Sequence, residues 1–288
     1  MRSVLITGGS GYFGTGMVKR LLELPDEGCY RICVYSRDEA KQASMRAALH
    51  DPEERIRWFI GDVRDQARLR QAMNGVDLVI QAAALKRIET GFYNPGEMVK
   101  TNIIGSMNVV EAATEAGVAK VVALSTDKAF RGISPYGLSK AMAEAIFLNA
   151  NNARGARGPR YAVVRYGNVW NSTGSILPTW REQKRRGAPL RVTDPECTRF
   201  YMTRKQAIDL VIKTASTMEG GELAIPDLPA YRVGDVLDAF LHGEDYPVEV
   251  VGLPGYEKMH EAMDETRSSD QARMMTVEEL RAAMDSVE

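Results

Sequence analysis

Residues 4–14 read Val4-Leu5-Ile6-Thr7-Gly8-Gly9-Ser10-Gly11-Tyr12-Phe13-Gly14, and this stretch decides the fold. Its three apolar residues predict a short strand, and the apolar pattern over residues 17–22 predicts a helix. Gly8, Gly11 and Gly14 permit a tight turn, close approach of backbone N–H groups to a diphosphate, and close packing of helix on strand. Surface turns also produce such sequences, but this one joins a first strand to a first helix. It therefore predicts a dinucleotide-binding site.

Further apolar segments alternate with helical patterns along the chain. Strand-like segments occupy residues 31–35, 56–60, 77–80, 120–124 and 161–165. Such alternation is typical of a parallel sheet with helices on both faces. The sequence therefore predicts an α/β fold, a Rossmann-type doubly wound parallel sheet with a smaller C-terminal substrate-binding lobe. We expect residues 1–168 to form the dinucleotide-binding domain, with residues 205–225 returning to it, and residues 169–204 and 226–288 to form the lobe.

Some single elements are also predicted. We expect helices over residues 95–116 and 233–241 and a short strand over residues 247–251. The sequence Thr276-Val277-Glu278-Glu279 has the form of a capping box. It predicts the start of a final amphipathic helix.

The residues after the strand over 120–124 are the candidate catalytic residues. Ser125-Thr126-Asp127-Lys128 lies at the end of that strand, at the sheet edge where ligands of open α/β sheets collect. Tyr136 and Lys140 are four apart on the next predicted helix and so share one face. A lysine ammonium near a phenol favours the phenolate and lowers the tyrosine pKa from about 10. Tyr136 is therefore a candidate general base, with an ordinary helical pair as the alternative.

Asp127 and Lys128 place a carboxyl group next to an amine at the same strand end. Such a pair can supply both the acid and the base of an elimination. A surface ion pair is the alternative. The nearby Tyr136 and Lys140 favour the catalytic interpretation.

Together these residues resemble the extended short-chain dehydrogenase/reductase family, which has a T-G-x-x-G-x-x-G loop and a Y-x-x-x-K pair. Within it they resemble the soluble UDP-N-acetylglucosamine 4,6-dehydratases (inverting) of bacterial polysaccharide biosynthesis. The matching segments lie at residues 35–39, 61–65, 82–86, 93–95, 100–102, 125–129, 165–169 and 198–200. They occur in the expected order and cover about residues 1–205.

The resemblance implies a reaction cycle that starts and ends with the same cofactor state. Tyr136, helped by Lys140, would remove the proton of the sugar 4-hydroxyl while hydride passes from C4 to NADP. Thr126 would position or polarise the C4 oxygen. Lys128 would then remove the C5 proton while Asp127 protonates the departing 6-hydroxyl. Hydride returns to C6, with or without inversion at C5, so the cofactor stays tightly bound and is recycled.

The predicted cofactor site combines the glycine loop with residues assigned by the resemblance. Ser36 and Arg37 end the second strand, where NAD-specific loops usually have an acidic residue, and Arg37 with Lys41 suits the extra phosphate of NADP. We therefore expect NADP rather than NAD, with a surface arginine as the alternative. The predicted cofactor-binding residues are Gly8, Ser10, Gly11, Tyr12, Phe13, Gly14, Ser36, Arg37, Lys41, Asp62, Val63, Ala82, Ala83, Ala84, Lys86, Asn102, Tyr136 and Lys140.

Three more of these residues have structural alternatives. Lys86 can be a loop cation. Asp62 can be the N-cap of the helix that runs through Leu69 and Met73, and its two roles can hold together. Asn102 can be an ordinary helix asparagine, although its counterpart in the superfamily supports the catalytic tyrosine and lysine.

The predicted substrate-binding residues are Lys86, Asn168, Arg199 and Glu257, all assigned by the resemblance. A buried structural arginine is the alternative for Arg199. Glu257 lies in residues 254–261, which resemble a P-G-E-K-x-H-E segment with one inserted residue. The chain departs from the family over residues 170–175, where an expected arginine is missing and Trp170 is added, and at Arg87, where relatives often have histidine. These departures leave the sugar and base open.

Composition limits the other functions. The 288 residues carry 37 basic and 38 acidic side chains, a net charge of −1, so no nucleic-acid partner is expected. No apolar segment approaches the roughly 18 residues that span a bilayer, and no signal peptide precedes the first strand, so we expect a cytoplasmic protein without membrane contact. Three histidines and three cysteines without metal-ligand spacing predict no metal site. The resemblance implies a homo-oligomer, a dimer or larger.

Two other functions stay open. One is an epimerase or a 5,6-dehydratase of the same fold acting on another nucleotide substrate. The other is a non-catalytic NADP-sensing protein, against which the complete set of catalytic residues argues.

Overall fold

A seven-stranded parallel sheet forms the centre of the computed structural model, which describes residues 3–24, 29–156 and 158–286. The strand order is β10-β6-β5-β4-β1-β2-β3, and every adjacent pair is parallel. The bounds are β1 Ser3–Thr7, β2 Arg31–Ser36, β3 Ile56–Ile60, β4 Leu78–Gln81, β5 Lys120–Thr126, β6 Arg160–Tyr166 and β10 Leu223–Ala224. The order reverses between β1 and β4, which is where open α/β sheets bind ligands. The predicted fold class is confirmed.

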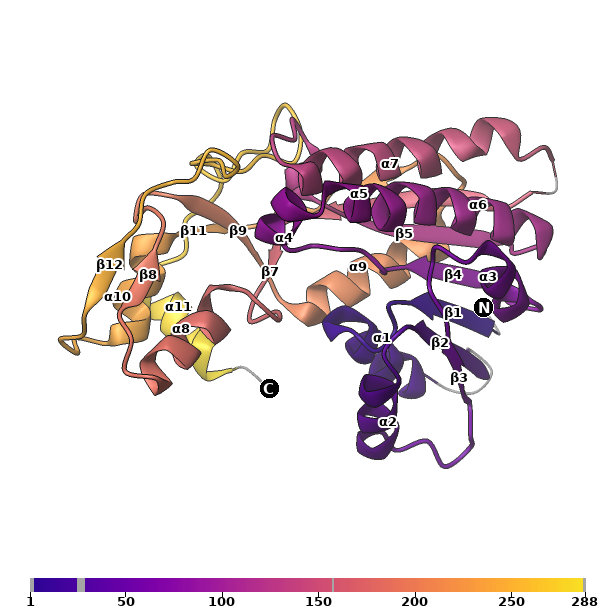
Figure 1. The fold of residues 1–288 in the computed structure, drawn as a ribbon, viewed down its shortest axis with the longest axis horizontal. Helices are drawn as coiled ribbons and strands as arrows, with labels where there is room; N and C mark the ends of the chain where they lie inside the picture. The colour runs from indigo at the N-terminus through magenta and orange to yellow at the C-terminus, as the bar shows by residue number, and fades with distance from the viewer. Residues whose placement is uncertain (1–2, 25–28, 157, 287–288) are drawn as a thin grey trace.

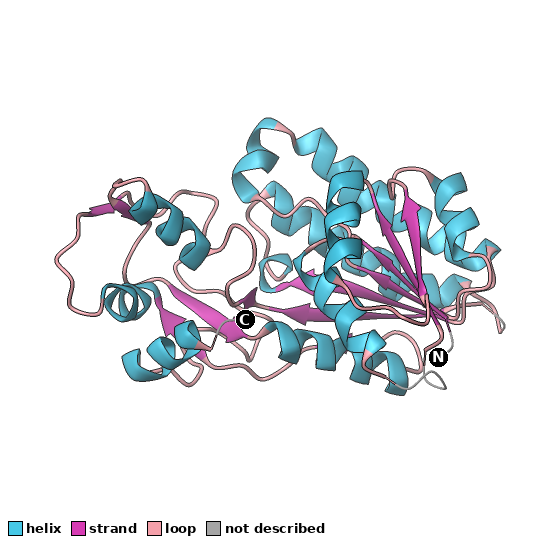
Figure 2. Ribbon diagram, turned by 90° about the horizontal axis from the view of Figure 1, so that it is seen from below, coloured by secondary structure: helices cyan, strands magenta, loops and turns pink. Residues whose placement is uncertain are grey.

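Helices cover both faces of this sheet (Figures 1 and 2). Successive residues of β1 point to opposite faces, so Val4 and Ile6 join one buried core and Leu5 the other. The first core contains residues of α1 Tyr12–Leu22, α2 Glu39–Ala48 and α9 Arg204–Thr217. The second contains residues of α3 Gln66–Met73, α6 Gly105–Glu115 and α7 Pro135–Ala153. Strands buried on both faces explain the continuous apolar runs in the sequence.

The predicted helix over residues 95–116 is divided into three segments, of which two are α-helical and one is π-helical. It consists of α5 Pro95–Met98, a π-helical segment Val99–Ile104 and α6, and α4 Ile88–Tyr93 precedes it. The helix expected at residues 233–241 is α10 Val233–Leu241, and the strand expected at residues 247–251 is β12 Val248–Val250. The capping box at Thr276 is present and starts α11 Val277–Asp285. These predictions are therefore confirmed.

A smaller group of elements lies beyond the carboxyl ends of the large sheet (Figures 1 and 2). It contains the three-stranded sheet β11-β9-β7 and the pair β12-β8, with α8 Ile176–Arg185, α10 and α11 around a core that includes Trp170 and Trp180. Its other strands are β7 Asn168–Val169, β8 Leu190–Val192, β9 Thr198–Met202 and β11 Ala230–Arg232. Between β9 and β11 the chain returns to the large sheet as α9 and β10.

Every helix within the described residues is too short or too polar to cross a membrane. Among those residues, no group of three or more histidine, cysteine, aspartate or glutamate side chains is placed to hold a metal ion.

Candidate active site

A cavity of about 1290 Å³ lies between the carboxyl edge of the large sheet and the smaller group of elements. Its wall contains every predicted site residue except Asp127 and Asn102. The predicted residues on the wall are Gly8, Ser10, Gly11, Tyr12, Phe13, Gly14, Ser36, Arg37, Lys41, Asp62, Val63, Ala82, Ala83, Ala84, Lys86, Thr126, Lys128, Tyr136, Lys140, Asn168, Arg199 and Glu257. Residues from six of the parallel strand ends and their loops therefore share one cavity.

The glycine loop packs too closely for side chains at two of its positions. Gly8 has φ of +64°, and a Cβ there would lie 3.0 Å from the Ala83 backbone. A Cβ on Gly14 would lie 2.5 Å from the carbonyl oxygen of Gly9. The N-terminus of α1 can therefore lie against the loop, and the residues of both line the cavity, an arrangement that fits a diphosphate.

The end of β2 is lined by side chains of both charges. Arg37 Nη1 lies 3.6 Å from Asp62 Oδ2, and Lys41 Nζ lies 3.3 Å from Asp38. Ser10 Oγ donates a hydrogen bond to Ser36 Oγ at 2.9 Å. Asp62 does not cap α3, because Asp65 is the N-cap and accepts a hydrogen bond from the Arg68 N–H. The alternative role considered for Asp62 is therefore wrong.

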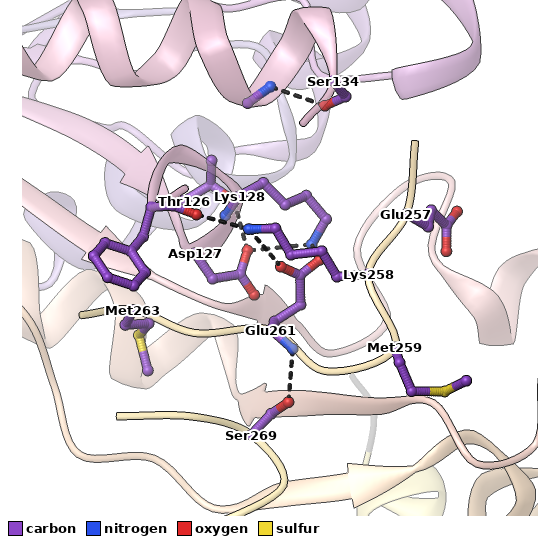
Figure 3. Close-up of polar contacts among 12 residues, drawn as sticks. Thr126, Asp127, Lys128, Ser134, Glu257, Lys258, Met259, Glu261, Met263 and Ser269 are labelled. Carbon is purple, nitrogen blue, oxygen red and sulfur yellow. Dashed lines mark hydrogen bonds and ion pairs between the residues drawn. The ribbon is translucent and has the colours of Figure 1, made fainter. Parts of the chain in front are cut away.

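Three of the catalytic candidates, Thr126, Asp127 and Lys128, lie where β5 ends (Figure 3). Thr126 is the last residue of β5, and Asp127 and Lys128 form the 3-10 turn that follows. Tyr136 and Lys140 lie on α7, which begins with an N-cap at Ser134 and a proline at its first position. The end of β5 and the start of α7 thus bring the five side chains together.

Lys128 is held by several polar groups. Its Nζ lies 3.2 Å from Asp127 Oδ1, 3.1 Å from Glu261 Oε1 and 3.3 Å from Asn168 Oδ1. Burial disfavours the ammonium, but the charges of Asp127 and Glu261 outweigh burial and raise the pKa of Lys128. Lys128 is therefore a cation at neutral pH in this structure.

Asp127 lies behind the cavity wall. Its side chain is fully buried, and Oδ1 accepts a hydrogen bond from Thr126 Oγ1 at 2.8 Å as well as from Lys128. Oδ2 is buried without a hydrogen-bond partner. A proton on Asp127 must therefore reach the cavity through Thr126 or Lys128, not by the direct contact expected from the sequence.

Burial sets the protonation of Tyr136 and Lys140. It raises the pKa of Tyr136 to about 12. The Lys128 cation and a hydrogen bond with Thr126 act in the opposite direction and lower this pKa, but burial has the larger effect. Burial lowers the pKa of Lys140 to about 8, which Glu144 partly opposes, and Lys140 Nζ donates to the Leu124 carbonyl at 2.6 Å. The expected lowering of the Tyr136 pKa by Lys140 is therefore not seen, because the cation that acts on the phenol is Lys128.

Asn102 lies in the π-helical segment and fixes the loop after β4. Its amide binds both backbone groups of Leu85, at 2.8 and 2.9 Å, and donates to Ser139 Oγ at 2.9 Å. Asn102 thus joins that loop to the residue before Lys140 and has no position on the cavity wall.

The predicted substrate residues differ in their freedom to bind a ligand. Arg199 donates to the carbonyls of Thr198 and Met259, and its guanidinium lies 3.1 Å from Glu257. Its guanidinium N–H groups are therefore largely engaged by the protein itself. Burial lowers the pKa of Lys86, and the positive charge of the neighbouring Arg87 lowers it further. Lys86 lines the cavity.

Glu261 is the main residue that sequence reasoning missed. It is buried beside Lys128, yet it comes from the C-terminal segment, whose only signal was the resemblance over residues 254–261. A glutamate in a loop gives no indication of burial by itself.

Comparisons with known proteins agree with this geometry. A family model described as "Polysaccharide biosynthesis protein" matches residues 4–282. The UDP-N-acetylglucosamine 4,6-dehydratase (inverting) of Campylobacter jejuni is 41% identical over 91% of this chain and 77% of its own. The UDP-glucose 4-epimerase of Rickettsia canadensis is 36% identical over 94% of this chain and 80% of its own.

Solved structures share the fold over the whole chain. The X-ray structure of Pen from Bacillus thuringiensis has a TM-score of 0.93 and 31% identity, and the match covers 100% of this chain and 98% of Pen. More distant structures of this fold, at 16 to 20% identity, have NAD bound. The chain therefore belongs to the polysaccharide biosynthesis protein family, within the extended short-chain dehydrogenase/reductases.

Proposed function

We propose that this chain is an NADP-dependent nucleotide-sugar 4,6-dehydratase that acts on UDP-N-acetylglucosamine or a similar sugar. One observation carries the proposal: Thr126, Lys128 and Tyr136 line the cavity together, and Asp127 contacts both Thr126 and Lys128 from behind the wall, where a sugar oxidised at C4 can undergo elimination. The identity to the Campylobacter jejuni dehydratase supports it. The sugar nucleotide would lie between the sheet edge and a substrate lobe of residues 169–204 and 226–288, near Lys86, Asn168, Arg199 and Glu257.

Each catalytic side chain has one task in the first step. The glycine loop has the shape to hold the diphosphate of a nicotinamide dinucleotide, which, when bound, would supply the hydride acceptor and donor of the cycle. Tyr136 accepts the proton of the 4-hydroxyl in its phenolate form, which is the minor form at neutral pH, and Lys128 supplies the nearby positive charge that favours that form. Thr126 orients the C4 oxygen.

The elimination step balances within the Asp127–Lys128 pair. The Lys128 ammonium passes a proton to Asp127 across their 3.2 Å contact, and the neutral amine then removes the C5 proton. The C6–O bond breaks as C5 and C6 form a double bond. The Thr126 hydroxyl protonates the departing hydroxyl and takes the Asp127 proton in exchange, so water leaves.

The test is incubation of the purified protein with UDP-N-acetylglucosamine in deuterated water, followed by mass spectrometry and NMR. A 4-keto-6-deoxy sugar with deuterium at C5 is expected. Lys128→Ala and Asp127→Asn should keep cofactor but lose water elimination, and Tyr136→Phe should lose oxidation. Full turnover by all three variants would contradict the assignment.

An epimerase or a 5,6-dehydratase is the second candidate. The altered stretch at residues 170–175 lines the cavity, and the Rickettsia canadensis relative is named an epimerase. The same experiment separates these functions, because an epimerase product keeps the mass of the substrate and a 5,6-dehydratase product lacks the 4-ketone.

We also propose NADP as the cofactor because Ser36, Arg37 and Lys41 line the cavity at the end of β2. Arg37→Ala should weaken NADP binding roughly 10- to 100-fold relative to NAD, since charge-assisted hydrogen bonds contribute about 1.5–3 kcal/mol. Arg46→Ala, on the same helix α2 and away from the cavity wall, is the matched control. Equal loss of NAD and NADP in Arg37→Ala would contradict the assignment.

A homo-oligomer is the remaining proposal. The helices α6 and α7 pack side by side and carry exposed apolar side chains. Ile104 immediately precedes α6, Met107 lies on α6, and Leu138 and Met142 lie on α7. Such a patch favours a protein contact. Met107→Lys with Leu138→Lys should lower the molar mass measured by light scattering, whereas an unchanged mass would exclude this face.

A further inference from the structure

Glu261 is a buried carboxylate held in place from two sides. Its backbone N–H donates to Ser269 Oγ at 2.9 Å, and its carbonyl accepts the Ser269 N–H at 2.7 Å. Its side chain is 2% exposed and extends towards the end of β5 (Figure 3). The C-terminal segment therefore presents one fixed negative charge to the catalytic turn.

That charge lies between two lysines. Glu261 Oε1 is 3.1 Å from Lys128 Nζ, and Oε2 is 3.9 Å from Lys258 Nζ. A cavity of about 10 Å³, the size of roughly one water, is lined by Lys128, Lys258 and Glu261. Lys128 thus borders the large cavity on one side and Glu261 on the other.

The charges around Lys128 come from several elements. The groups that act on it are Asp127 in its own turn, Tyr136 on α7, Arg199 on β9, Tyr231 on β11, and Lys258 and Glu261 on the C-terminal segment. Of the carboxylates that the structure describes, Asp127 and Glu261 contact the ammonium. Glu261 is therefore the one contacting carboxylate from outside the catalytic turn, among the described residues.

We propose that Glu261 is a positioning residue that holds the Lys128 amine at the cavity wall. Glu261 thereby also sets the pH range in which Lys128 can remove the C5 proton. This inference rests on the proposed dehydratase function. The negative charge of Glu261, 3.1 Å from Lys128 Nζ, favours the ammonium form of Lys128. Its removal therefore moves the limb of the elimination profile that reports Lys128 to lower pH.

The test compares Glu261→Gln, Glu261→Asp and the wild type over a range of pH, with C4 oxidation and water elimination followed separately. Glu261→Gln should keep its cofactor and C4 oxidation. Its elimination profile should move by about 1–3 pH units to lower pH, the usual effect of one charge at 4–6 Å. Glu261→Asp, which keeps the charge, should keep the wild-type profile at a reduced rate.

Glu265→Gln is the matched control, because it removes a carboxylate from the same segment at an exposed site paired with Arg131. It should behave as wild type. An unmoved profile in Glu261→Gln, with oxidation and elimination reduced equally, would show a structural role only and overturn the proposal.

A second measurement separates this proposal from the proposed function. NMR titration of Lys128 Nζ, assigned by the signal missing in Lys128→Ala, should show a lower midpoint in Glu261→Gln than in wild type. Equal midpoints would overturn the role of Glu261 whatever the reaction is. Absence of elimination by the wild type, with shifted midpoints, would instead overturn the dehydratase assignment alone.

Discussion

At the residue scale, burial controls the chemistry of the catalytic side chains more than their spacing in the sequence. Tyr136 and Lys140 share a helix face, but Lys140 donates to a backbone carbonyl of β5, and Lys128 is the cation that favours the phenolate. Lys128 consequently serves both steps of the proposed reaction. Its ammonium assists Tyr136 during oxidation, and its neutral form acts in the elimination.

Lys140 gives a prediction about stability. Its pKa is about 8 in the folded chain and 10.5 when unperturbed, so the unfolded chain binds more protons between these values and stability rises with pH there. Below pH 8 the buried charge costs roughly 3 kcal/mol, and the bond to Leu124 returns about 1 kcal/mol. Lys140→Met should therefore be about 2 kcal/mol more stable at pH 7, and urea unfolding should show this gain shrinking towards pH 10. A difference that is constant with pH would contradict the prediction.

Local sequence was sufficient to group Thr126, Asp127, Lys128, Tyr136 and Lys140, because a strand end and the helix after it bring these residues together whatever the rest of the fold. It was insufficient for Glu261, which reaches Lys128 only through the tertiary fold. The local sequence also gave no sign that Asp127 lies behind the cavity wall. The burial of a side chain at a strand end depends on how β9 and the C-terminal segment pack over it.

At the scale of elements, strands were predictable because the large sheet is buried on both faces and its strands are apolar throughout. The π-helical segment Val99–Ile104 was not predictable, because its residues have the same pattern as an α-helix. The added width turns Asn102 towards Leu85 and Ser139, where its amide is fully used. The smaller group of elements was the least predictable part, since its strands are short and its sheets small.

The contact between the glycine loop and α1 gives a prediction for one element. Gly14→Ala would place a Cβ 2.5 Å from the Gly9 carbonyl, so the loop must move, at a cost of about 1–3 kcal/mol. The displaced N–H groups should also weaken cofactor binding at least tenfold, as measured by calorimetry. Gly96→Ala in α5, where nothing lies within 4 Å, is the matched control and should leave both quantities nearly unchanged. Normal cofactor affinity in Gly14→Ala would contradict the proposed role of the loop.

At the scale of the molecule, a few long-range contacts join the large sheet to the C-terminal third. Arg165 on β6 binds Glu144 on α7 and also donates to the carbonyl of Met263. Tyr12 in the glycine loop donates to the carbonyl of Trp170 at 3.1 Å, and the Trp170 indole donates to Ala283. The two walls of the cavity are therefore fixed to each other by buried polar contacts.

The Arg165–Glu144 pair predicts how strongly the molecule depends on one such contact. Both side chains are buried, and Arg165 Nε donates to Glu144 Oε1 at 2.8 Å. Glu144→Gln alone leaves the guanidinium uncompensated, so the free energy of unfolding should fall by about 3–5 kcal/mol. The double variant Glu144→Gln with Arg165→Met should lose less than the sum of the two single variants, because neither charge is left buried alone.

Urea unfolding of the three variants gives the coupling energy of the pair. Glu219→Gln provides the control, because its 3.1 Å pair with Arg160 is exposed and such pairs contribute only about 0–1 kcal/mol. Additive losses would mean that the two charges act independently. A coupling of several kcal/mol would show instead that the buried charge pair joins β6 to the catalytic helix α7.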